Sequence, residues 1–207
     1  MPIPTPYVNA PRIGAGEETA VDVRTLVIGD TFELEVGPGR GGFIFERAAA
    51  APQAGLVGLE IRRKWATIVD SRLAKQGLSP RARVFAEDAK WAMRRMGPDG
   101  IFERVFMHFP DPWWKKKHEK RLVMGDVFLR EASRLLKKGG ELFVQTDVEE
   151  RAALYEEAIA TESTFVPFGD AEGSPRLAEN PYEARSPREH RAIADQLPVY
   201  RLRYRRI

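Results

Sequence analysis

Three glycines with a defined spacing are the first residues whose arrangement could support chemistry. Gly37, Gly39 and Gly42 have GxGxxG spacing in the segment ELEVGPGRGGF, between a β-prone run and a run of helix-forming composition. Because glycine has no Cβ atom, a ligand can lie against the backbone of such a turn, although sharp strand-to-helix turns also use glycines for structural reasons alone. Glu60 follows about 20 residues later, where an acid bonds ribose hydroxyls in dinucleotide sites. The pattern therefore predicts a nucleotide-containing ligand.

Glu35, directly before the glycines, bears on which nucleotide this is. Its carboxylate would repel the anionic pyrophosphate of NAD, whereas it would attract a ligand with a cationic amino-acid end. S-adenosylmethionine has such an end, and it also carries ribose hydroxyls for Glu60 and an adenine amine for Asp88. Asp88 is also well suited to cap the helix that follows it. We expect S-adenosylmethionine as the cofactor, and an NAD-dependent oxidoreductase is the alternative.

A second stretch with chemical potential is HFPDPWWKKKHEKR, residues 108–121. Asp111 lies between Pro110 and Pro112, whose fixed φ angles narrow the directions in which the carboxylate can point. The two tryptophans that follow offer flat apolar faces for a base or a sulfonium group. An isolated segment of this kind is usually a simple turn, but the basic run behind it argues against that interpretation. We expect Asp111 to lie beside the transferred methyl group.

The basic run itself indicates a polyanionic partner. Five cations and one acid lie between Lys115 and Arg121, and the C-terminal segment YRLRYRRI adds four arginines. Clustered charge sets the local potential that a phosphate backbone meets, so it matters more than the net charge of +3. Such runs are usually solvated surface, but this one opens a helix expected to begin near Glu119, beside the methyl site. The location favours a substrate that is itself a polyphosphate.

The composition excludes several other chemistries. The 207 residues include no cysteine, which removes disulfides, thiolate metal sites and cysteine nucleophiles and fits a reducing compartment. His108, His118 and His190 are scattered without acids at metal-ligand spacing, so no metal site is expected. No apolar run is long enough to span a bilayer, and the N-terminal residues do not resemble a secretion signal. We therefore expect a cytoplasmic protein.

Strand and helix patterns alternate from Phe32 to Thr161, which predicts an α/β fold with a doubly wound, mostly parallel sheet. The expected strands are 32–36, 55–61, 82–88, 101–109 and 141–147, with a long amphipathic helix over 120–140. Two more strands, 163–168 and 197–207, enclose a long polar loop. One domain is expected over 1–207, with residues 1–30 as an extended arm on its surface.

Taken together, these segments resemble those of the bacterial tRNA (guanine-N7)-methyltransferases of the TrmB type. The resemblance covers roughly residues 32–204 and rests on LEVGPGRGGF, GLEI, EDA, QTD, more loosely NPYE, and above all FPDPWWKKKHEKR. It implies the class I methyltransferase (Rossmann-like) sheet with an antiparallel C-terminal strand and S-adenosylmethionine as cofactor. It also implies methyl transfer to N7 of a guanosine in tRNA, namely guanosine 46 of the variable loop.

The resemblance also implies roles for individual residues. Cofactor contacts are expected from the glycine loop and four acids, of which Asp111 is also catalytic: Gly37, Gly39, Glu35, Glu60, Asp88 and Asp111. The target nucleoside is expected to meet Lys115, Asp147, Asn180, Pro181, Tyr182 and Glu183. The RNA is expected to meet Lys117, His118, Lys120 and Arg121. Asp147 could instead cap the helix that follows it.

Three residues depart from the pattern of the family: Trp114, Leu122 and Asn180. Leu122 removes a cation, and lysine in place of arginine in the basic run keeps the charge but loses the bidentate fork. Two further alternatives stay open from the sequence, namely methylation of an exocyclic amine and a non-catalytic RNA-binding protein. The choice between monomer and homodimer is also open.

Overall fold

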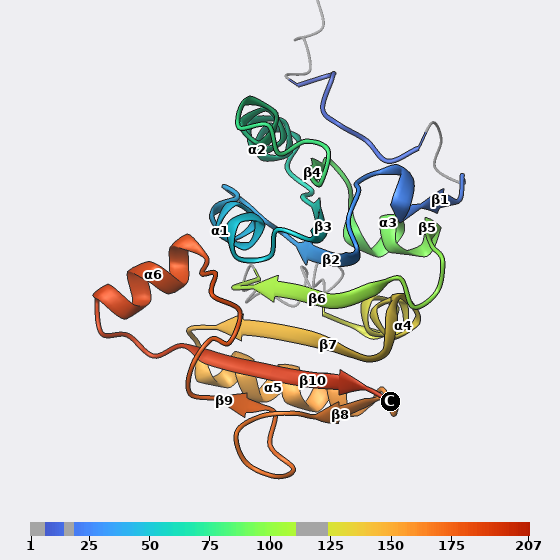
Figure 1. Cartoon of the computed structure of the whole chain (residues 1–207). Helices are drawn as coiled ribbons and strands as arrows, with labels where there is room; N and C mark the ends of the chain where they lie inside the picture. The colour runs from blue at the N-terminus through green and yellow to red at the C-terminus, as the bar shows by residue number, and fades with distance from the viewer. Residues whose placement is uncertain (1–6, 15–18, 111–123) are drawn as a thin grey trace, which may run out of the picture.

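The computed structural model describes residues 7–14, 19–110 and 124–207. Within these residues the main sheet has the strand order β4-β3-β2-β6-β7-β10-β8, with β9 paired to β10 (Figure 1). Its strands are β2 (Thr31–Val36), β3 (Ala54–Leu59), β4 (Ala82–Phe85), β6 (Phe102–His108), β7 (Leu136–Thr146), β8 (Phe165–Pro167), β9 (Arg176–Leu177) and β10 (Tyr200–Arg206). The strands from β4 to β7 are parallel, and β10 is antiparallel to both β7 and β8. The predicted fold class is confirmed.

Helices cover both faces of this sheet, and Figure 1 shows α1, α2 and α6 on one side of the strands with α3 and α4 on the other. The helices are α1 (Gly42–Ala50), α2 (Arg63–Lys75), α3 (Ala89–Arg95), α4 (Asp126–Leu135), α5 (Glu149–Ala160) and α6 (Pro187–Ala194). The larger core lies between the sheet and α3, α4 and α5, and a second core lies under α1 and α2.

The sequence of β2 explains how its side chains divide between the two faces. Side chains alternate along a strand, so Leu34 and Val36 enter the large core while Glu33 and Glu35 point to the face of α1. All four are buried, as expected for a central strand covered on both sides. Two acids of β2 therefore lie inside the molecule: Glu33 in the middle of the strand, and Glu35 one residue before its carboxyl end.

The order of the strands creates a crevice at that end. From β2 the chain proceeds to β3 and β4 on one side, and it then crosses to β6 and β7 on the other. The first helix after β2, α1, and the described helix after β6, α4, consequently lie on opposite faces of the sheet. Such a topological switch point is where open α/β sheets bind their ligands.

Two expected elements differ from the structure around residues 119–140. The helix α4 begins at Asp126 rather than near Glu119, because Gly125 is fully extended with φ −176° and ψ 177°. It ends at Leu135, and the KKGG segment belongs to β7. The register between β6 and β7 shifts between Phe102 and Arg104, and Gly139 has φ +80°, so these glycines form an irregularity in a strand rather than a helix stop.

The polar segment 169–197 and the described part of the N-terminal arm contain more regular structure than the sequence suggested. The segment contains β9 and α6, and α6 begins with Ser186 accepting a hydrogen bond from the Glu189 backbone N–H, with a proline at the first helical position. In the arm, Ile13 and Val23 are buried in the large core. The described part of the arm also contains β1 (Val21–Asp22), which pairs with β5 (Met96–Gly97), and the 3₁₀ helix Val23–Thr25.

Candidate cofactor site

A cavity of about 620 Å³ lies at the switch point of the sheet. Its walls are the glycine loop, the ends of β3, β4 and β6, the start of α3, Tyr155 of α5 and the first residues of α6. This volume is within the range of small-molecule sites. Burial raises the pKa of the Tyr155 phenol, so this part of the wall is neutral over a wide pH range.

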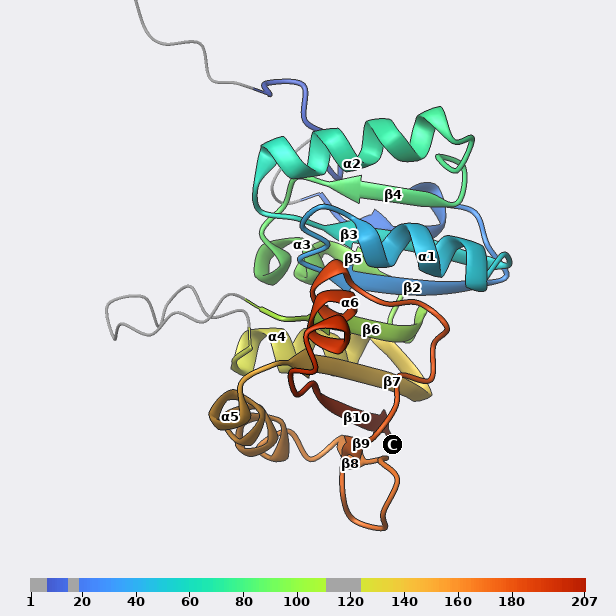
Figure 2. The ribbon, with the colours of Figure 1, turned by 90° about the vertical axis from the view of Figure 1, so that its left-hand side faces the viewer.

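The glycine loop uses its glycines for two different reasons. Gly37 and Gly39 have φ values of +77° and +54°, and a Cβ atom at Gly37 would meet no atom within 4 Å. Their backbone therefore needs glycine and faces open space. Gly42 is different, because a Cβ atom there would lie 2.3 Å from the ring of Pro187. Figure 2 shows the resulting approach of α6 to α1.

Glu60 and Asp88, two of the residues predicted to contact the cofactor, both line the cavity. Glu60 is buried, and its two oxygens accept hydrogen bonds from the backbone N–H groups of Gly39 (2.9 Å) and Arg62 (2.8 Å). Asp88 caps α3, since its side chain accepts a hydrogen bond from the Lys90 backbone N–H at 3.0 Å. Asp88 thus caps α3 from a position on the cavity wall.

Glu35 lines the same cavity and meets a residue that the sequence did not mark as functional. Its Oε1 lies 3.1 Å from Nδ1 of His108, and the two side chains are only 5% and 3% exposed. Glu35 Oε2 is buried and has no hydrogen-bond partner among the described residues. A free buried carboxylate oxygen beside a glycine cradle fits the ammonium end of S-adenosylmethionine. His108 could have been found from its place at the end of the strand next to Glu35.

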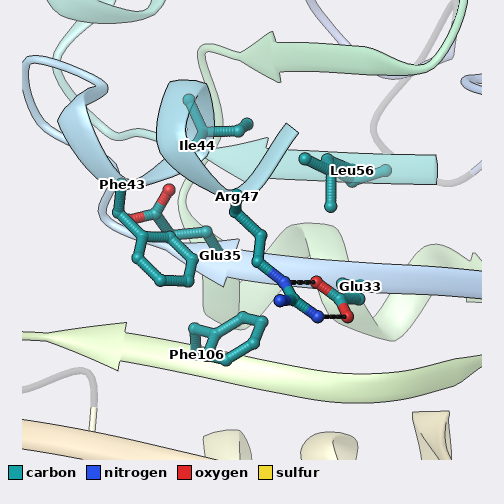
Figure 3. Close-up of a pocket in the computed structure, with 8 residues that line it drawn as sticks. Glu33, Glu35, Phe43, Ile44, Arg47, Leu56 and Phe106 are labelled. Atoms are coloured by element: carbon teal, nitrogen blue, oxygen red, sulfur yellow. Dashed lines mark hydrogen bonds and ion pairs between the residues drawn. The ribbon is translucent and has the colours of Figure 1, made fainter. Parts of the chain in front are cut away.

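A buried ion cluster lies behind this site. Figure 3 shows Arg47 of α1 bound to both carboxylate oxygens of Glu33, each at 2.7 Å. Arg104 of β6 also donates to Glu33 at 2.8 Å. Burial alone lowers the pKa of Arg104, but the hydrogen bond and charge of Glu33 raise it overall. Arg47 also donates to the backbone carbonyl of Tyr182 at 2.8 Å.

The predicted nucleoside-binding segment 180–183 forms a turn held by this cluster. Asn180 Oδ1 accepts from the Tyr182 backbone N–H, and its Nδ2 donates to Ala184 O and to Glu189 Oε2, all within 3.0 Å. The buried Tyr182 donates its hydroxyl proton to Glu141 at 2.9 Å, and burial followed by the charge of Glu141 raises its pKa. Among the described residues, this part of the chain lines the cavity with Ser186, Pro187 and Arg188 rather than with 180–183.

Asp147 does not cap the next helix, because α5 begins after Val148 without a side-chain cap. Instead its Oδ2 lies 2.5 Å from Nη2 of Arg188. Arg188 lines the cavity, so the pair brings Asp147 to its margin. Arg188 was missed in the sequence because an arginine in a polar loop carries no distinguishing pattern.

Six predicted site residues lie outside the described residues: Asp111, Lys115, Lys117, His118, Lys120 and Arg121. The described residues on either side of this segment, Pro110 and Met124, both line the cavity. The described ranges contain no group of three or more potential metal ligands. They also contain no helix long and apolar enough to cross a membrane.

Comparisons with known proteins agree with this geometry. A family model described as "Putative methyltransferase" matches residues 30–202. The tRNA (guanine-N(7)-)-methyltransferase of Anaeromyxobacter dehalogenans is 40% identical over 176 residues, which are 84% of this chain and 85% of that protein. The enzyme of the same name from Myxococcus xanthus is 33% identical, covering 83% of this chain and 81% of its own.

A solved structure shows the same fold. The crystal structure of the 16S rRNA methyltransferase KamB aligns with a TM-score of 0.60 at 17% identity, over 89% of this chain and 91% of that one. This likeness extends the agreement from sequence to the arrangement of strands and helices. The chain belongs to the family of tRNA (guanine-N7)-methyltransferases.

Proposed function

We propose that this methyltransferase transfers a methyl group from S-adenosyl-L-methionine to N7 of guanosine 46 in the variable loop of tRNA. The observation that carries the proposal is the buried Oε2 of Glu35, which lies beside the glycine cradle of the cavity and has no partner in the described part of the chain. It suits a cationic amino-acid end and disfavours a pyrophosphate. The relatives named above supply the substrate class and the reacting atom.

The cavity residues divide the task of holding the cofactor. Glu35 takes the ammonium group, Glu60 the ribose hydroxyls and Asp88 the adenine amine, with the backbone of Gly37 and Gly39 beneath. When bound, S-adenosylmethionine supplies an electrophilic methyl group on its sulfonium. The cofactor occupies the cavity between the glycine loop and the end of β6, where Pro110 leads to Asp111.

The chain need not remove a proton from the substrate, because guanine N7 carries an in-plane lone pair. Its task is to align N7 with the methyl group where water is excluded. Asp111 acts as a hydrogen-bond acceptor that orients the base or the sulfonium rather than as a strong base. Lys115, Asp147 and residues 180–183 hold the target nucleoside.

The RNA is held through its phosphates by Lys117, His118, Lys120 and Arg121. In an A-form helix N7 lies in a deep, narrow groove that side chains reach poorly, so a loop guanosine is the accessible target. This agrees with the variable loop as the location. A tRNA substrate and a chain without cysteine both favour the cytoplasm as the compartment.

The test combines cofactor binding with a map of the modified base. Calorimetry should show binding of S-adenosylmethionine and none of NAD. Incubation of tRNA with enzyme and cofactor, followed by borohydride and aniline, should cut the strand at guanosine 46, because only N7-methylguanosine gives scission. A transcript with adenosine at that position is the matched control. Methyl incorporation without scission would point to an exocyclic amine and would refute the proposal.

A further inference from the structure

The contact between Glu35 and His108 joins the two strands that border the switch point. Glu35 is the penultimate residue of β2 and His108 is the last residue of β6, and these two strands are direct neighbours in the sheet. The imidazole is held in place by rings, since its centroid lies 4.1 Å from that of Phe43 and 5.8 Å from that of Phe106. These ring contacts fix the orientation of the imidazole, and with it the direction in which Nδ1 of His108 points toward Glu35.

The two inward-facing acids of β2 have partners of opposite kind. Glu33 is neutralised by Arg47 and Arg104. Among the described residues Glu35 pairs with His108 alone, and its second oxygen is buried without a partner. An arginine or lysine would cancel the charge of Glu35. An imidazole can donate one hydrogen bond while uncharged, so it can orient the carboxylate and leave its negative charge in place.

We propose that His108 is a positioning residue for cofactor recognition: it holds Oε1 of Glu35 so that Oε2 faces the ammonium group of S-adenosylmethionine. This inference rests on the proposed function and adds a role for a residue that the cofactor does not need to touch. A carboxylate that is already oriented loses less rotational freedom when the ligand binds. His108 therefore acts on affinity for the amino-acid end of the cofactor and not on the nucleoside end.

Two ligands separate these ends. S-adenosylhomocysteine carries the ammonium group, whereas 5′-methylthioadenosine has the same nucleoside without the amino-acid part. In His108→Leu we expect the affinity for S-adenosylhomocysteine to fall about tenfold and that for 5′-methylthioadenosine to change by less than about twofold. Calorimetry on the full chain measures both values. A parallel loss for both ligands would show a merely structural role and would overturn the inference, as would no loss for either.

Conservative variants keep the test valid if His108→Leu folds poorly. The amide nitrogen of asparagine lies close to the place of Nδ1, and that of glutamine close to Nε2. His108→Asn should therefore restore most of the affinity for S-adenosylhomocysteine, and His108→Gln should restore less. Equal affinity in the two variants would contradict a role of Nδ1.

A double substitution identifies the residue through which His108 acts. Glu35→Gln should weaken S-adenosylhomocysteine selectively, and adding His108→Leu to it should cause little further loss, because the two act as one unit. Additive losses would mean that His108 acts elsewhere. If the wild-type chain bound neither S-adenosylmethionine nor its product, the proposed function would fail together with this inference, whereas normal binding without any effect of His108 would refute this inference alone.

Discussion

At the scale of single residues, the acids of the cavity were the most predictable part of the site. Glu35, Glu60 and Asp88 all line it, because each lies close to the carboxyl end of a strand and the fold brings these ends to one edge of the sheet. His108 and Arg188 were not predicted as functional. The environment of His108 is set by Glu35 of the neighbouring strand. That of Arg188 is set by Asp147, which lies in a distant part of the chain.

Glu60 gives the first prediction at this scale. Both of its oxygens accept backbone N–H groups, so Glu60→Gln would place an amide donor against another donor and loosen the glycine loop. We expect affinity for S-adenosylhomocysteine to fall about tenfold, measured by calorimetry. Glu46→Gln is the matched control, because Glu46 also accepts a backbone N–H, from Arg185, but does not line the cavity. Equal losses in both variants would speak against a local role of Glu60.

Asp111 gives the second, from its place in the sequence between two prolines. If it orients the substrate by accepting a hydrogen bond, Asp111→Ala should lose most of kcat while cofactor affinity falls less. Asp111→Asn keeps an acceptor and should retain more activity than the alanine variant. Single-turnover methylation of tRNA and calorimetry measure the two quantities. Unchanged turnover in Asp111→Ala would remove this residue from the mechanism, and equal loss in both variants would favour a general base.

At the scale of elements, the segment that carries the turn 180–183 depends on a buried charge. Arg47 bridges Glu33 of β2 and the carbonyl of Tyr182, with its side chain only 10% exposed. Arg47→Met would leave Glu33 with Arg104 alone, and removing one partner of a buried pair costs about 3–5 kcal/mol. Urea unfolding should show a loss of this size. The double variant Glu33→Leu with Arg47→Met should lose less than the two single losses combined, and strict additivity would contradict the coupling.

The elements also show where sequence patterns stop being informative. The start of β7 was assigned to the preceding helix, because Leu135 and Leu136 continue an apolar pattern that only the pairing of Leu136 with Phe102 interrupts. The helix α6 was assigned to a loop, although Ser186, Pro187 and Glu189 form a recognisable helix start. Glu189 of this helix is buried, and it accepts hydrogen bonds from the side chains of Arg201 and Asn180, which lie outside the helix. Contacts of that range leave no local periodicity.

At the scale of the whole molecule, the fold followed from the alternation of strands and helices, since parallel strands joined by helices have few possible arrangements. The strand β10 was read correctly from alternation in VYRLRYR, and Leu202 and Tyr204 do enter the core. The N-terminal arm was predicted as an extended segment on the surface, but Ile13 and Val23 are buried in the large core. These two residues belong to no periodic pattern, and residues distant in the sequence bury them.

The buried tyrosines of the molecule lead to a prediction about alkaline pH. Burial raises the pKa of Tyr155, Tyr182 and Tyr204 above the ordinary value of about 10. Their contribution to stability is complete below that pH and is lost as pH rises, because the unfolded chain ionises first. Thermal unfolding should show a melting temperature that falls above about pH 10. Tyr182→Phe should fall less steeply than wild type over that range, and identical slopes would contradict the assignment.

The close approach of Gly42 and Pro187 limits which residues can occupy these two positions at the same time. The third glycine of the loop has no room for a methyl group because a proline from the C-terminal part occupies that space. A larger residue at position 42 is tolerable only with a smaller one at position 187, so the two positions should covary among relatives. We therefore expect the cofactor loop and the helix that helps to enclose the cavity to change together among relatives.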